Sequence, residues 1–176
     1  MVVALPAVRT LYWSSVASPR GTCVILGTKS GICWLGTPGT PLETGLNWIQ
    51  RKMNFAALIE DATIETLRQA TDQLERYFGG EHVQFTCPLE LYGTPFQLQV
   101  WNILIRVPYG ETRSYAEIAR AIGHPSAVRA VGAANGANPV AIIVPCHRII
   151  GSNGALTGYG GGLPTKAWLL ALETKK

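Results

Sequence analysis

The spacing of apolar residues changes near residue 95, and this change limits the chain to a two-part fold. Before it, short runs rich in Val, Ile, Trp and Tyr lie at 10–15, 22–26 and 32–35, separated by Gly, Pro and Ser. Such runs are typical of antiparallel strands joined by turns. Apolar residues then recur at steps of three or four over 42–53 and 64–78, which predicts two helices, the second ending at Gly79-Gly80.

After residue 95 the pattern predicts short helices at 96–105, 115–122, 126–135 and 164–173. We therefore expect an N-terminal α/β domain over 1–80, a connector over 81–94 and a C-terminal domain over 95–176. The two middle helices flank a Gly123-His124-Pro125 turn, which is the spacing of a helix-turn-helix. Two ordinary core helices joined by a tight turn are the alternative interpretation.

The second helix of this pair is made mostly of small residues, and Arg129 projects from them. Gly is costly inside a helix, so small residues there indicate a close approach of the backbone to a partner. The partner is either another helix or a nucleic-acid groove. The small residues are Ala130, Gly132, Ala133, Ala134, Gly136 and Ala137.

Charge is distributed unevenly between the two halves. The chain is 47% hydrophobic and 15% charged, a balance that excludes a disordered chain. Residues 1–94 carry seven basic and eight acidic side chains, whereas residues 95–176 carry eight basic and three acidic ones. This asymmetry favours a polyanion as the partner of the second half. Met1–Val8 does not resemble a signal peptide and no apolar run is long enough to span a membrane, so we expect a cytoplasmic location, or a nuclear one in a eukaryote.

A buried run of β-branched residues, Val140–Val144, ends in Pro145-Cys146-His147-Arg148. We expect this run to be a strand or an extended segment that shelters the Cys146 thiol. A neighbouring His or Arg favours the nucleophilic thiolate. Adjacent side chains of an extended chain point to opposite faces, so His147 reaches Cys146 only if the backbone turns or a water bridges them. A buried cysteine that acts only as a small hydrophobe is the alternative.

The other cysteines, Cys23, Cys33 and Cys87, form no CxxC pair, and reduced thiols are the expectation. The spacing of Cys and His residues does not indicate a metal site. Convergence of Cys23, Cys33 and His82 on a zinc ion is the remaining alternative.

Several motifs, in order along the chain, resemble those of the O6-alkylguanine-DNA alkyltransferases, the methylated-DNA–protein-cysteine methyltransferases. The resemblance runs from about Leu74 to Glu173, and before Leu74 it is one of general architecture only. The motifs are Gly93-Thr94-Pro95-Phe96-Gln97, Val100-Trp101, Val107-Pro108-Tyr109-Gly110-Glu111-Thr112, Ser114-Tyr115, Arg129-Ala130-Val131-Gly132, Asn138-Pro139-Val140, Pro145-Cys146-His147-Arg148, Gly154-Ala155 and Tyr159-Gly160-Gly161-Gly162-Leu163.

The resemblance implies an α+β fold: a small ribonuclease H-like N-terminal domain with a short antiparallel sheet, and a mostly helical, winged-helix-like C-terminal domain with the helix-turn-helix. It implies direct-reversal DNA repair, in which an alkyl group passes irreversibly from O6-alkylguanine to Cys146 in a single turnover. O4-alkylthymine is a second candidate substrate. The protein would act as a monomer on the minor groove of double-stranded DNA, with little sequence specificity, and without cofactor or metal.

The resemblance also implies roles for individual residues. His147 would act through a water as the base for Cys146, and Glu173 would orient the imidazole. Asn138 would tie the second helix to the active-site segment, and Tyr115 would assist base rotation and the departure of guanine. The implied base-binding residues are Val144, Tyr159, Gly160 and Lys166, and the implied DNA contacts are Tyr115, Arg129, Ala130, Gly132, Ala133 and Arg148.

Two other classes of protein compete with this interpretation. A non-catalytic helix-turn-helix DNA-binding protein explains the basic half and the paired helices but gives Cys146 no task. A cysteine hydrolase explains the thiol but requires an oxyanion hole and repeated turnover.

Overall fold

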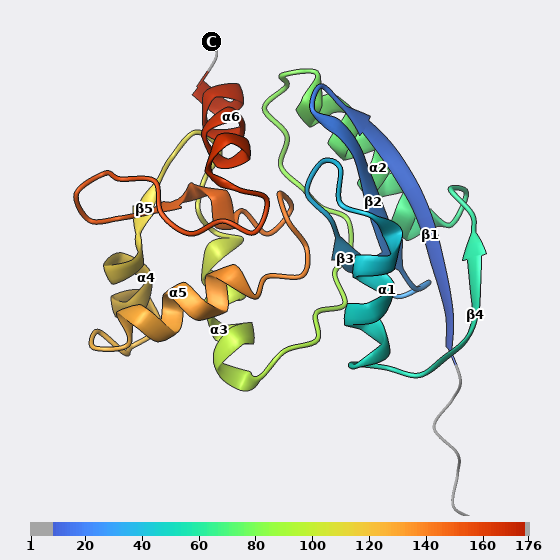
Figure 1. The fold of residues 1–176 in the computed structure, drawn as a ribbon, viewed down its shortest axis with the longest axis horizontal. Helices are drawn as coiled ribbons and strands as arrows, with labels where there is room; N and C mark the ends of the chain where they lie inside the picture. Colours follow the sequence, from blue (N-terminus) through green and yellow to red (C-terminus); the bar gives the residue numbers. More distant parts are fainter. Residues whose placement is uncertain (1–8, 175–176) are drawn as a thin grey trace, which may run out of the picture.

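The chain folds with a sheet on one side and most of the helices on the other (Figure 1). The computed structural model describes residues 9–174. Met1–Val8, where the sequence predicts no signal peptide, lies outside the described residues. Among the helices of residues 9–174, none combines the length and the apolar character that a membrane crossing requires.

The sheet has four strands in the order β3-β2-β1-β4. Strand β1 (Arg9–Ser18) pairs with β2 (Gly21–Gly27), and β2 pairs with β3 (Ile32–Leu35), both in the antiparallel sense that the sequence predicts. The sequence did not predict β4 (Phe55–Glu60), which lies parallel to β1 at the sheet edge. Most of β4 is exposed, and a short apolar run does not by itself distinguish a strand from a helix.

Both faces of the sheet are covered by helices. Along β2, Cys23 and Ile25 pack in a core that contains α2 (Glu65–Phe78), whereas Val24 and Leu26 face the side of α1 (Leu42–Gln50). Burial on both faces explains why β2 is an unbroken apolar run rather than an alternating one. The helix α2 ends as predicted, with Gly80 in the left-handed region at φ +89°.

The C-terminal helices lie within a few residues of the predicted ranges: α3 (Pro95–Leu104), α4 (Tyr115–Ala121), α5 (Val128–Gly136) and α6 (Leu163–Thr174). Two capping boxes fix the starts of α3 and α4, because the Thr94 and Ser114 side chains accept hydrogen bonds from backbone N–H groups of the first turn. The cap at Ser114 makes Tyr115 the first residue of α4. The turn to α5 contains Gly123 at φ +77°.

The edge of the sheet at β3 is covered by two segments from elsewhere in the chain. The Ile32 N–H donates to the Pro88 carbonyl at 2.8 Å, within the connector. The Leu35 N–H donates to the Pro139 carbonyl at 2.9 Å, and the Ala141 N–H donates to the Leu35 carbonyl at 3.1 Å. The segment that leads to Cys146 is therefore bonded directly to the N-terminal sheet. One buried apolar cluster accordingly contains side chains from both parts of the chain.

Candidate active site around Cys146

The segment before Cys146 is buried, but it is not the extended strand that the sequence predicts. Val140 pairs with Leu35, and the chain then turns so that the Val144 N–H donates to the Val140 carbonyl at 3.0 Å. Ile142 lies at φ +70°, which is rare for a β-branched residue. The prediction was wrong because β-branched apolar composition indicates burial without fixing the local path of the backbone.

Asn138 holds this turn together. Its Nδ2 donates to the Val144 carbonyl at 2.8 Å, and its Oδ1 accepts from the Val140 N–H at 3.0 Å. The same Nδ2 lies 3.1 Å from the Cys146 Sγ. Asn138 lies two residues after the end of α5, so one side chain links the region after the second helix of the pair to the turn and the thiol.

The Cys146 thiol is buried at the start of a short 3-10 turn, Cys146–Arg148. Burial raises the pKa of Cys146, whereas the hydrogen bond from Asn138 and the positive charge of Lys166 lower it. The net shift is upward, so the thiol is neutral in the free protein and must lose a proton before it can act as a nucleophile. Asn138 and Lys166 favour the thiolate here, rather than the neighbouring Arg148 that the sequence suggested.

His147 points to Glu173 because the backbone turns at Cys146. Its Nε2 lies 2.7 Å from the Glu173 Oε1, and both side chains are completely buried. Burial lowers the pKa of His147, and the Glu173 carboxylate raises it, with a net downward shift. A neutral imidazole that donates from Nε2 carries a lone pair on Nδ1. This Nδ1 has no hydrogen-bond partner among residues 9–174, so it is available to accept a proton.

Arg148, for which the resemblance implies a DNA contact, is buried in the structure. It is only 6% exposed, and its guanidinium donates to both Glu173 oxygens at 2.9 Å and to the Val107 carbonyl at 2.6 Å. Three of its five N–H groups are therefore engaged within the protein, and the side chain is buried away from the surface that a phosphate could reach. Burial raises the pKa of Glu173, but hydrogen bonds from His147 and Arg148 outweigh this and lower it to about 2.

Glu173 has a third side-chain partner that was not predicted from the sequence. The Tyr77 hydroxyl, on α2, donates to the Glu173 Oε1 at 2.7 Å. Tyr77 is completely buried and lies far from Glu173 in the sequence. In the sequence, Tyr77 is only a tyrosine on the apolar face of a predicted helix. An ordinary core tyrosine has the same pattern.

Lys166 and Tyr115 both hold the loop that follows β6 (Ile149–Ile150). Lys166 is fully buried, and its Nζ donates to the Thr157 carbonyl at 2.8 Å and to the Ile149 carbonyl. The Tyr115 hydroxyl donates to the same Thr157 carbonyl at 3.0 Å. Lys166 is therefore a buried residue and not a solvated one. Both side chains hold the start of the Gly-rich loop, residues 158–162.

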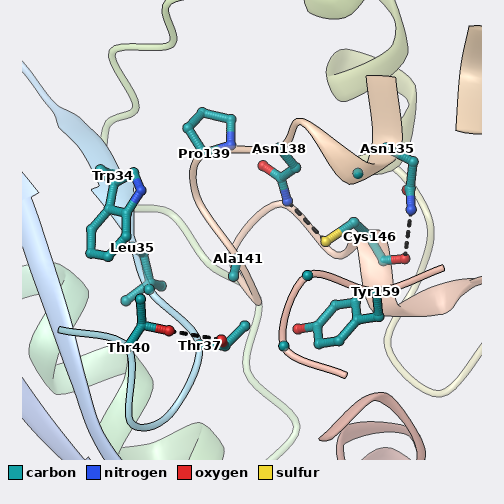
Figure 2. Close-up of a pocket in the computed structure, with 14 residues that line it drawn as sticks. Trp34, Leu35, Thr37, Thr40, Asn135, Asn138, Pro139, Ala141, Cys146 and Tyr159 are labelled. Atoms are coloured by element: carbon teal, nitrogen blue, oxygen red, sulfur yellow. Dashed lines mark hydrogen bonds between the residues drawn. The ribbon is translucent and has the colours of Figure 1, made fainter. Parts of the chain in front are cut away.

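A cavity of about 160 Å³ opens beside the thiol (Figure 2). Cys146, Tyr159 and Gly160 line it, whereas Val144 does not. The Val144 carbonyl already accepts from Asn138 and from the Cys146 N–H at 2.8 Å. Five further lining residues come from the end of β3 and the loop after it, which the sequence did not connect with the site: Trp34, Leu35, Gly36, Thr37 and Thr40.

The outer face of α5 presents small residues and one cation. Arg129, Ala130 and Ala133 are exposed, and Gly132 is half-buried. A Cβ at Gly132 would lie 3.9 Å from the Tyr115 ring, so this face is continuous with the start of α4. The backbone of α5 can therefore come close to a partner surface, with Arg129 as its charged group.

No group of three or more His, Cys, Asp or Glu side chains that could hold a metal ion is found within residues 9–174. Cys23 and Cys33 pack on opposite faces of the sheet, and His82 stacks on Tyr109. The arrangement gives no support to the zinc alternative.

Two family models match the chain over nearly its whole length. Residues 11–91 match the ribonuclease-like domain of 6-O-methylguanine DNA methyltransferase, and residues 95–175 match the DNA binding domain of the same family.

Curated relatives and solved structures agree with these matches. The inducible methylated-DNA–protein-cysteine methyltransferase of Bacillus subtilis is 45% identical over 94% of this chain and 92% of its own length. The methylated-DNA–protein-cysteine methyltransferase of Mycolicibacterium paratuberculosis is 60% identical over 93% of this chain and 92% of its own length. A solved structure of Mycobacterium tuberculosis OGT in complex with DNA is 45% identical, with a TM-score of 0.76 and coverage of 92% of both chains.

Proposed function

The chain belongs to the 6-O-methylguanine DNA methyltransferase family, and from this premise we propose that Cys146 accepts the alkyl group from O6-alkylguanine in duplex DNA. The protein repairs DNA by alkyl transfer, as a methylated-DNA–protein-cysteine methyltransferase. The observation that supports Cys146 as the acceptor is its position at the edge of a cavity. The thiol accepts a hydrogen bond from Asn138, and the residue that follows it, His147, is paired with the buried Glu173.

In the proposed reaction the thiol proton passes to Nδ1 of His147, with a water as the bridge. The Sγ lone pair forms a bond to the alkyl carbon as the bond from that carbon to O6 breaks. Guanine leaves with O6 as a carbonyl oxygen, and N1 takes up the proton. The Glu173 carboxylate stabilises the imidazolium that forms in between, the role that a buried acid has beside a catalytic histidine.

Tyr115 and Lys166 are proposed to support the departing guanine. Burial raises the pKa of Tyr115, so its hydroxyl stays protonated and remains a donor. To reach the base it would exchange its bond to the Thr157 carbonyl for one to guanine, which is a local change in a single side chain. Tyr159 and Gly160 would contact the base within the cavity, and the Val144 carbonyl would do so only by giving up a present partner.

The DNA is proposed to lie against α5, with its minor groove on Ala130, Gly132 and Ala133. A base inside a duplex cannot reach a buried thiol, so the damaged guanine must rotate out of the stack, at a cost of a few kcal/mol. Arg129 would occupy the space that the base leaves. The minor groove offers a degenerate pattern of donors and acceptors, which suits binding with little sequence preference. One chain holds every group that this scheme uses, so a monomer is sufficient for the reaction.

The acceptor is tested by intact-protein mass spectrometry after incubation with duplex DNA that contains O6-methylguanine. We expect a mass increase of one methyl group in place of one hydrogen, at no more than one equivalent, located on Cys146. Cys146→Ser should show no increase, whereas Cys87→Ser, which removes another buried thiol, should react as the wild type does. An undamaged duplex is the matched substrate control.

The competing classes predict different results in the same experiment. A non-catalytic DNA-binding protein would retain the duplex without any change of mass. A cysteine hydrolase would turn over repeatedly, and no methyl group would remain on the protein. Methylation of another cysteine, with Cys146→Ser fully active, would overturn the assignment of the acceptor.

A further inference from the structure

We infer that the loop from Gly36 to Thr40, in the N-terminal part of the chain, is the wall that selects O6-alkyl groups by size. This inference rests on the proposed function, because it assigns a substrate-selecting surface to the same cavity. The loop contributes Gly36, Thr37 and Thr40 to the lining, while the thiol comes from the C-terminal part. In Figure 2 the two threonines lie across the hollow from the Cys146 sulfur.

The wall is internally braced. The Thr37 and Thr40 hydroxyls are 3.0 Å apart and hydrogen-bonded to each other. Gly36 has no room for a side chain, since a Cβ there would lie 2.6 Å from the Trp34 ring and 3.0 Å from the Thr40 Cβ. The loop therefore holds its two threonines in a fixed position rather than as free surface side chains.

The wall also touches the Gly-rich loop on the opposite side of the cavity. A Cβ at Gly161 would lie 2.8 Å from the Thr37 Cγ2, so Gly161 and Thr37 are already in close contact. The cavity is thus closed on this side by a contact between the two parts of the chain. A group that occupies the cavity beside Cys146 therefore shares it with Tyr159 and the two threonines.

The wall cannot easily move away from the thiol. The backbone hydrogen bonds that join Leu35 to Pro139 and Ala141 lie directly before the loop and directly before the turn to Cys146. They fix the spacing between the base of the loop and the active-site segment. A bulky substrate must therefore fit the existing space or strain these bonds.

The reaction geometry brings the alkyl substituents toward a wall of this kind. Displacement at carbon requires the sulfur and O6 to lie on opposite sides of the reacting carbon, so the remaining substituents project sideways. A methyl group projects only hydrogens, whereas a benzyl group projects a ring. The threonine methyl and hydroxyl groups are then the surface against which the larger group is tested.

The test measures single-turnover rate constants for alkylation of Cys146 by duplexes that contain O6-methylguanine or O6-benzylguanine. We expect Thr40→Ala to raise the benzyl-to-methyl rate ratio, and Thr40→Leu to lower it, each by about tenfold, the effect that a change of one or two heavy atoms in a pocket can have. Thr40→Val keeps the volume but loses the hydrogen bond to Thr37, so the ratio should stay near that of the wild type. Pro38→Ala is the matched loop control, because Pro38 does not line the cavity.

Two results would overturn the inference. One is an unchanged ratio in both Thr40→Ala and Thr40→Leu while methyl transfer still proceeds. The other is a change of the rate ratio in Thr40→Val as large as that in Thr40→Ala. That result would indicate that the ordering of the loop, and not the size of residue 40, sets the ratio. Thermal melting of each variant shows whether it is folded. A wild-type protein that takes no methyl group at all would refute the proposed function instead, so the two failures are distinguishable.

Discussion

The Glu173 carboxylate accepts hydrogen bonds from three buried side chains, those of His147, Arg148 and Tyr77. Two of these partners follow Cys146 directly in the chain, and the third comes from the N-terminal part. Such a carboxylate can neither rotate nor pick up a proton at ordinary pH. At the scale of single residues, the properties of the site therefore depend on the charge of one buried acid.

Loss of the Tyr77 hydroxyl should weaken the fold measurably. Tyr77→Phe keeps the ring but removes one donor to a buried carboxylate, and hydrogen bonds to charged groups contribute about 1.5–3 kcal/mol. We expect the free energy of unfolding in urea to fall by about 2 kcal/mol. Tyr109→Phe is the control, because its hydroxyl makes only a 3.4 Å contact with the Leu172 carbonyl. Equal losses in the two variants would refute this role of Tyr77.

Acid should destabilise the protein through Glu173. Its pKa is about 2 in the folded chain and 4.5 ordinarily, so the unfolded chain takes up the proton first as the pH falls. The stability that Glu173 contributes is complete above pH 4.5 and is lost as the pH falls toward 2. By linkage the loss amounts to about 3 kcal/mol.

The measurement is urea unfolding at a series of pH values across this range. Glu173→Gln, less stable throughout because it leaves Arg148 without its counter-charge, should lack this part of the pH dependence. The prediction fails if the slope of stability against pH is the same in the two proteins.

Some residues of the site could be predicted from the sequence and others could not. The resemblance of Pro145-Cys146-His147-Arg148 to one family singled out the thiol and the imidazole. Of the two routes that the sequence left open between them, a backbone turn or a bridging water, the structure shows a turn at Cys146 that directs His147 to Glu173. The pairing of Arg148 with Glu173 was not predicted, because a basic residue in a basic half gives no sign that an acid is buried beside it. Tyr77 was out of reach, since a contact so distant in sequence leaves no local pattern.

At the scale of secondary structure, the elements that carry local signals were predicted well. Gly79-Gly80 predicted the end of α2, and the apolar spacing predicted the ends of α3 and α4 to within one residue. The two helices predicted on either side of the Gly123 turn are α4 and α5. Two segments, β4 and Val140–Val144, were not predicted correctly, for the same reason. Both are short apolar runs, and the backbone path of such a run depends on its tertiary partner. For Val140–Val144 that partner is the edge of β3, together with the Asn138 side chain.

The small residues on α5 should limit DNA affinity when they are enlarged. Ala133 is exposed, so Ala133→Leu costs little in folding but holds the helix backbone away from the groove. We expect affinity for undamaged duplex to fall at least tenfold, about 1.4 kcal/mol, in a fluorescence anisotropy titration at fixed salt. Ala171→Leu, an equally exposed alanine on α6, should bind as the wild type does. Unchanged affinity in Ala133→Leu would contradict the proposed placement of DNA on α5.

At the scale of the whole molecule, alkylation of Cys146 should lower the melting temperature. The thiol is 5% exposed and packed against Asn138, which also holds the turn before it. An added alkyl group crowds the Asn138 amide that lies against the sulfur, and overpacking costs about 1–3 kcal/mol. Calorimetry of the reacted and the free protein would measure the difference, with Cys146→Ser after the same DNA treatment as the control. A spent form that melts at or above the temperature of the free form would contradict this expectation.

The pairing of β3 with the segment before Cys146 has a consequence for the design of chimeras. Leu35 bonds to Pro139 and Ala141, and Thr37 touches Gly161, so the two halves of the chain are complementary surfaces and not independent modules. In a hybrid made of residues 1–94 from one family member and the remaining residues from another, the two surfaces would not match. Taking positions 35–40, 139–141 and 159–161 from the same family member would keep the two sides of this interface matched.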